Sequence, residues 1–81
     1  MKLTPAQREL LQAIYEGQIL KSHRDLAGRK EYRLHTMTGQ SSRITWETVA
    51  ALQDLKLIDS NKKFPAATYW LTEAGRAQLV N

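Results

Sequence analysis

A chain of 81 residues without a single cysteine must hold its fold together by side-chain packing alone. Disulfides, thiolate zinc sites and cysteine nucleophiles are excluded for the same reason. The hydrophobic fraction of 42% supplies enough apolar surface for one small core. No apolar run approaches the roughly 20 residues that cross a bilayer, and the first residues lack the apolar stretch of a signal peptide. We therefore expect one domain over residues 1–81, located in the cytoplasm.

The strongest local signal is a helix at the start of the chain. Thr4 suits an N-cap, Pro5 suits the first helical position, and Gln7 completes a capping box. Apolar side chains then recur at helical spacing. Gly17 supplies the left-handed residue that commonly ends a helix.

After this helix the hydrophobic period changes to that of strands. Polar and apolar residues alternate strictly over residues 31–36, so Tyr32 and Leu34 are predicted to face the core. A turn containing Asp and Gly precedes them. We expect a β-hairpin over residues 18–36 and a polar loop over residues 37–42.

A second helix is predicted to begin near Thr45, because Ile44 and Val49 have the spacing of a hydrophobic staple around that cap. Two strands, residues 56–60 and 67–71, should follow as a second hairpin. A last helix over residues 73–80 is capped by Thr72 and is expected to be weakened by a glycine at position 75. The main core is expected to comprise Leu10, Leu11, Ile14, Val49, Leu52, Leu55 and Leu71.

These elements predict the α+β class, in the order helix, hairpin, helix, hairpin, short helix. Residues 45–58, with the sequence TWETVAALQDLKLI, resemble the recognition helix and first wing strand of MarR-like winged-helix regulators. Residues 69–76, YWLTEAGR, look like the second wing strand and the helix after it. The resemblance implies a small winged-helix-like domain. The sequence departs from that family before the recognition helix, because a hairpin is predicted there instead of a scaffold helix.

A second family resemblance covers most of the chain and rests on three features. They are the first helix pattern that ends at Gly17, the turn HRDLAGR at residues 23–29, and LKLIDS at residues 55–60 before a tyrosine-bearing strand. This layout is similar to that of the YjhX-like proteins. Members of that group are described as toxins that act on a DNA topoisomerase, so the resemblance implies a protein partner.

The formal net charge is +4, and the whole excess lies between residues 21 and 43. That segment holds six basic and two acidic residues, whereas basic and acidic residues are equal in number elsewhere. A concentration of positive charge makes an anionic partner plausible.

In a DNA-binding domain of this kind, the second helix would enter the major groove by its N-terminal end, and the wing would contact phosphates. The nucleic-acid-binding residues expected on this basis are Ser41, Ser42, Arg43, Thr45, Trp46, Gln53, Lys62 and Lys63. Glu47 and Asp54 on the same helix oppose this interpretation, since most recognition helices are more basic. A solvated helix face is the alternative.

The first hairpin carries a separate set of cations. A basic ribbon, with Tyr32 as a stacking ring, could be formed by Lys21, Arg24, Arg29, Lys30 and Arg33. The alternative is an edge hairpin whose charges prevent it from pairing with another sheet.

Two functions fit these features. The first is binding of duplex DNA by a small transcriptional regulator of the mobile-element or phage type. The second is a protein-interaction module, a toxin or inhibitor of a DNA-handling enzyme such as a topoisomerase, with an exposed Trp46 or Trp70 as its anchor. His23 and His35 lack the spacing of a zinc site or a catalytic triad, so we expect no enzyme activity, metal or cofactor.

Overall fold

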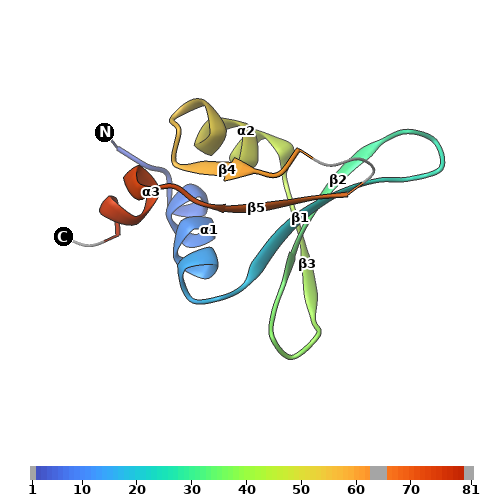
Figure 1. Cartoon of the computed structure of the whole chain (residues 1–81), viewed down its shortest axis with the longest axis horizontal. Coiled ribbons are helices and arrows are strands. Elements are labelled where there is room, and N and C mark those ends of the chain that lie inside the picture. Colours follow the sequence, from blue (N-terminus) through green and yellow to red (C-terminus); the bar gives the residue numbers. More distant parts are fainter. Residues whose placement is uncertain (1, 63–65, 80–81) are drawn as a thin grey trace.

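The structure is a computed structural model that describes residues 2–62 and 66–79. Its described part forms an antiparallel five-stranded sheet and three helices, which confirms the α+β class (Figure 1). The elements in chain order are α1 (Pro5–Tyr15), β1 (Ile19–Arg24), β2 (Lys30–His35), β3 (Ser41–Ile44), α2 (Trp46–Asp54), β4 (Ile58–Ser60), β5 (Ala66–Leu71) and α3 (Glu73–Ala77). The last helix therefore ends before the predicted residue 80, which lies outside the described residues.

Both predicted hairpins are present, and they belong to one sheet. The strand order is β3-β2-β1-β5-β4, so β1 lies in the centre. The predicted polar loop over residues 37–42 is wrong in part, because only residues 36–40 form a turn and Ser41–Ile44 pair with β2. This strand has one apolar residue, Ile44, so it lacks the alternation that would have revealed it.

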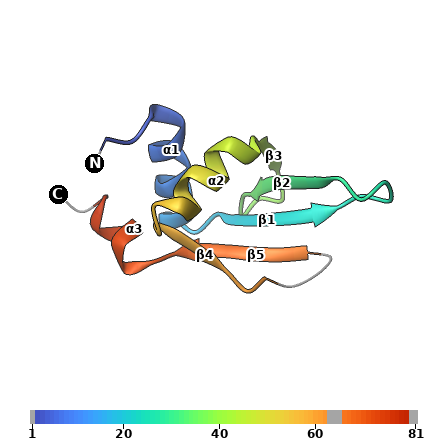
Figure 2. The same cartoon turned by 90° about the horizontal axis from the view of Figure 1, so that it is seen from above.

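Helices α1 and α2 contact each other and cover one face of the sheet (Figure 2). The predicted capping box of α1 is confirmed, because Thr4 Oγ1 accepts a hydrogen bond from the Gln7 amide at 3.2 Å and Gln7 Oε1 accepts one from the Thr4 amide at 3.1 Å. Gly17 has a φ of 105°, as its predicted role requires. The core between these helices and the sheet contains the fully buried side chains of Leu11, Leu20, Val49, Leu52 and Leu57.

The predicted core is correct for α1 and the middle of α2 but wrong at Leu55. Leu10, Leu11, Val49 and Leu52 are buried, and Ile14 and Leu71 pack at the margin of the core. Leu55 is 37% exposed. The helix ends at Asp54, and Lys56 adopts a φ of 62°. This turn carries Leu57, instead of Leu55, into the core.

Gly75 has a different role from the predicted one. Thr72 caps α3 as expected, since its Oγ1 accepts a hydrogen bond from the Gly75 amide at 3.1 Å. A Cβ atom at Gly75 would overlap the carbonyl oxygen of Leu57. Glycine is therefore required here by close packing of two backbone segments.

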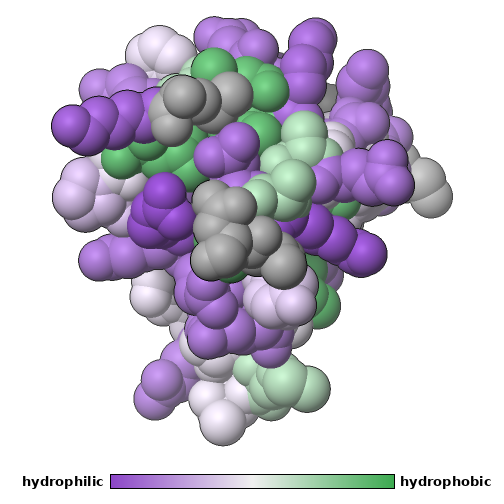
Figure 3. All heavy atoms as spheres, turned by 90° about the vertical axis from the view of Figure 1, so that its left-hand side faces the viewer, coloured by the Kyte–Doolittle hydropathy of each residue, from purple (hydrophilic) through white to green (hydrophobic). Residues whose placement is uncertain are grey.

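The molecule is elongated, with principal extents of 42 × 28 × 21 Å. Both chain ends lie at one end of the long axis, and the β1–β2 turn lies at the other (Figures 1 and 2). Hydrophilic side chains cover most of the end that carries the termini, and the larger apolar area lies in the upper part of that view (Figure 3). Among the described residues, no helix is long and apolar enough to span a membrane.

Candidate nucleic-acid interface

Strand register sorts the residues of the sheet into two faces. Residues directly opposite each other on antiparallel strands point to the same side. Leu20 is paired with Leu34 and Tyr69, and these side chains face α1 and α2. The next residues along these strands face the other way. We call this second side, turned away from α1 and α2, the outer face.

Three predicted cations meet in one row on the outer face. Lys21 of β1 lies opposite Arg33 of β2, and Arg33 lies opposite Arg43 of β3. We call these three residues the basic row. Lys21 and Arg33 are half-buried, whereas Arg43 is exposed.

Glu31 binds two members of the basic row. Its Oε1 accepts hydrogen bonds from Nη2 and Nε of Arg43 at 2.9 and 3.3 Å, and it lies 3.1 Å from Nη2 of Arg33. The Arg43 bond, followed by the Arg33 bond, lowers the pKa of Glu31 below its ordinary value. Among the described strands, the other outer-face carboxylate is Asp59 on β4, two strands away from Lys21. One carboxylate among three cations leaves the row with a net positive charge.

The structure corrects the interpretation of this region as an edge hairpin. β1 is flanked by β2 and β5, and β2 is flanked by β1 and β3. Lys21 and Arg33 therefore lie on interior strands, where no edge has to be protected from pairing. Within the basic row, protection of an edge can account only for Arg43 on β3.

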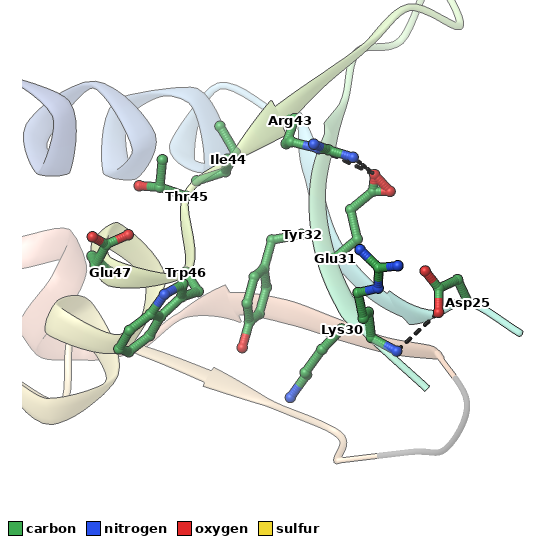
Figure 4. A pocket seen from close by; sticks show the side chains of 10 residues that line it. Asp25, Lys30, Glu31, Tyr32, Arg43, Ile44, Thr45, Trp46 and Glu47 are labelled. Atoms are coloured by element: carbon green, nitrogen blue, oxygen red, sulfur yellow. Dashed lines mark hydrogen bonds and ion pairs between the residues drawn. The ribbon is translucent and has the colours of Figure 1, made fainter. Parts of the chain in front are cut away.

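The residues predicted at the start of the second helix are divided between a strand and the helix. Ser41, Ser42 and Arg43 belong to β3, and the Arg43 side chain points to Glu31 instead of to the helix start (Figure 4). Thr45 is the N-cap residue but makes no side-chain cap, because its hydroxyl bonds to that of Thr48 at 2.8 Å.

The remaining predicted helix and wing residues are scattered. Trp46 is the first residue of α2 and is 65% exposed, and Gln53 lies two turns further along and is half-buried. Lys62 follows β4 and is exposed, with a φ of 55°. Lys63 lies outside the described residues. Since β3 and β4 are opposite edges of the sheet, the structure does not bring Arg43 and Lys62 together.

At the hairpin tip, two charged residues are used to build the turn. Arg24 Nη1 donates to the Gly28 carbonyl oxygen at 2.9 Å. Asp25 Oδ1 accepts from the amides of Ala27 and Arg29, each at 2.9 Å. The side chains of Arg29 and Lys30 remain exposed beside this turn.

An open groove of about 340 Å³ lies between β2 and the start of α2 (Figure 4). We call it the aromatic groove, since Tyr32 and Trp46 line it. The other lining residues are Asp25, Arg29, Lys30, Glu31, Arg43, Ile44, Thr45 and Glu47. The sequence predicted a binding role for Tyr32 and for Trp46 separately. That both line one groove could not be predicted, because their juxtaposition depends on β3, which was not predicted.

Tyr32 forms a fixed wall of this groove. Its ring meets that of buried Tyr69 edge to face, with centroids 6.0 Å apart and planes at 63°. Lys30 Nζ lies 5.4 Å from the Tyr32 ring centroid. Burial, and secondly the neighbouring Tyr69, raises the pKa of Tyr32.

Two further features lie outside the basic row and the aromatic groove. A depression of about 370 Å³ is lined by Ile14, Tyr15, Trp70, Leu71 and Arg76, in which Tyr15 is 53% exposed and Trp70 is 45% exposed. The rings of His23 and His35 lie 6.4 Å apart at 76°. In the described part of the chain, no three His, Asp or Glu side chains are grouped so that they could hold a metal ion.

No protein-family model, curated protein or solved structure matches this chain.

Proposed function

We propose that this protein is a small DNA-binding domain, of the kind used in transcriptional regulation, that contacts the phosphate backbone through the basic row. The observation that carries the proposal is the placement of Lys21, Arg33 and Arg43 directly opposite one another on adjacent strands. Like charges in that position destabilise a sheet. An anionic ligand would offset this repulsion, and the phosphates of DNA supply a row of negative charges.

The distribution of charge along the chain supports the same partner. The whole net charge of +4 comes from residues 21–43, which form most of β1, β2 and β3. The helices and the termini lie outside this segment. A one-sided positive field orients the protein as it approaches a polyanion and raises the rate of association.

A winged-helix-like arrangement is part of the proposal. In this proposal α2 takes the place of a recognition helix, β4 and β5 form the wing, and α3 is the helix after it. Lys62 then lies in the wing, after β4. Glu47 and Asp54 make α2 unfavourable as the main phosphate contact, so we assign that contact to the basic row.

The test is a salt titration of duplex-DNA binding by fluorescence anisotropy. The variant Lys21→Ala/Arg33→Ala/Arg43→Ala removes the row, and Lys2→Ala/Arg8→Ala/Arg76→Ala removes the same charge from positions outside the sheet. Each lost phosphate contact reduces the slope of log K against log salt by about 0.9, so the row variant should lose up to about 2.7 units. The control variant should keep the parental slope.

Two results would overturn the proposal. One is a row variant that binds DNA like the parent while its circular dichroism shows a native fold. The other is a parent protein that does not bind duplex DNA at about 50 mM salt, where counterion release strongly favours binding.

A protein-interaction module is the second candidate, favoured by the exposed Tyr15 and Trp70 beside one depression. Aromatic side chains of this kind anchor protein interfaces. The partner would be a DNA-handling enzyme such as a topoisomerase, as the resemblance to the YjhX-like proteins implies. Binding to it should depend weakly on salt and should be lost in Trp70→Ala, while the row variant should keep it.

A further inference from the structure

We propose that the aromatic groove binds one unpaired base of the DNA, stacked against Trp46 and Tyr32. The inference rests on the proposed function, and it adds that the preferred substrate has a single-stranded segment. Tyr32 and Trp46 come from β2 and α2, and they point into the same groove from its two sides (Figure 4).

Trp46 is an unusual residue for an exposed helix start. The indole is 65% exposed, although its neighbours Val49 and Leu52 on the same helix are fully buried. It is therefore not part of the core, and folding alone gives no reason for an aromatic side chain at this position. Stacking on an aromatic ring is available to every base, because each base presents a flat π-face.

The opposite wall is already in place before a ligand binds. Tyr32 is held by its contact with Tyr69 and by packing against the core. A wall that does not have to be ordered saves the entropy that binding otherwise costs. The volume of about 340 Å³ is in the range of small-ligand sites, roughly 300–1,000 Å³.

The polar lining suits a nucleotide. Arg29 and Lys30 lie at the hairpin side of the groove, where a phosphate attached to the base would meet them. Glu47 lies on the helix side beyond Trp46 (Figure 4). A carboxylate accepts hydrogen bonds from the N–H groups that an unpaired base exposes on its edge.

The groove is also continuous with the basic row. β3 pairs only with residues 32–35 of β2 and ends at Ile44, where the chain leaves the sheet. The edge of β2 on the β3 side is therefore unpaired at Lys30 and Glu31. Arg43 belongs to the row and lines the groove as well. A DNA strand held on the row can thus reach the groove around this edge, but a base that is stacked and paired inside a duplex cannot enter it.

Trp46 and Trp70 are the two tryptophans of the chain, so each can be followed alone. Trp70→Phe leaves Trp46 as the fluorophore, and Trp46→Phe leaves Trp70. The ligands are a blunt duplex and the same duplex with a short single-stranded cytosine overhang, compared at equal salt. We expect the overhang, and not the blunt duplex, to quench the fluorescence of Trp46. The fluorescence of Trp70 should stay constant with both ligands.

The affinity measurement uses Trp46→Ala with Trp70→Ala as its matched control. Trp46→Ala should weaken binding of the overhang about 5- to 150-fold, the loss expected for one stacked base, and should leave blunt-duplex binding unchanged. Trp46→Phe should restore most of this loss, because phenylalanine also stacks.

The outcomes separate the two proposals. If the protein binds both DNAs equally, or if Trp46→Ala weakens both by the same factor, the groove proposal is wrong and the basic row remains supported. If neither DNA binds, both proposals are wrong.

Discussion

Gly75→Ala should destabilise the protein, although alanine is the better helix former. Judged by helix propensity alone, the substitution in α3 should stabilise the helix by about 1 kcal/mol. The structure predicts the opposite sign. The new Cβ would overlap the carbonyl oxygen of Leu57 and would lie 3.1 Å from its carbonyl carbon. It would also lie 3.4 Å from Cδ2 of Leu71.

The magnitude follows from what has to move. The Leu57 carbonyl oxygen accepts a hydrogen bond from the Thr72 amide at 3.1 Å, which ties the end of α2 to the start of α3. Losing this bond costs about 0.5–1.5 kcal/mol, and forcing an extra methyl group into a packed site costs about 1–3 kcal/mol. After the gain in propensity is subtracted, a net loss of about 0.5–3.5 kcal/mol remains.

Urea unfolding followed by circular dichroism measures this loss from the midpoint and the slope. Ala77→Gly on the exposed side of α3 is the control, since it changes propensity without a close contact and should cost at most about 1 kcal/mol. A midpoint for Gly75→Ala above that of the parent protein would refute the close-packing argument.

Three further results are expected. Leu52→Ala should cost about 2–5 kcal/mol in urea unfolding, because this side chain is fully buried, whereas Leu55→Ala should cost much less. Glu31→Gln should strengthen DNA binding, because it releases the two guanidinium groups that Glu31 binds, and Glu16→Gln should not. The lowered pKa of Glu31 means that its ion pairs stabilise the fold above the unfolded-state pKa, and that this contribution disappears as the pH falls through the folded-state pKa. A carboxyl-carbon NMR titration should show that the pKa of Glu31 lies below the ordinary value for a glutamate.

The helix starts could be predicted from the sequence because their signals are local. The capping box at Thr4 and Gln7 and the cap at Thr72 each involve residues three positions apart. Such contacts depend little on the rest of the fold, so residue identity and spacing are sufficient. The start of α2 after Thr45 was also predicted correctly, from the local spacing of Ile44 and Val49.

Features that depend on distant segments could not be predicted in this way. β3 is a short edge strand, and only its register with β2 shows which side chains it places beside Glu31. The exposure of Leu55 depends on the left-handed turn at Lys56, for which the sequence has no glycine signal. The aromatic groove requires both the edge position of β3 and the direction of α2, and no local pattern contains that information.

The same strand register that builds the core also builds the basic row. Leu20 is fully buried opposite Leu34, so the next residues, Lys21 and Arg33, must face the other side of the sheet. A slip of β2 by one residue would turn Leu34 to the outer face and Arg33 into the core, which the burial of apolar surface opposes. The register is thus specified by side chains on the face opposite the row. Replacing the three cations with alanine should leave that register intact, and loss of DNA binding in a natively folded row variant can then be attributed to the lost charges.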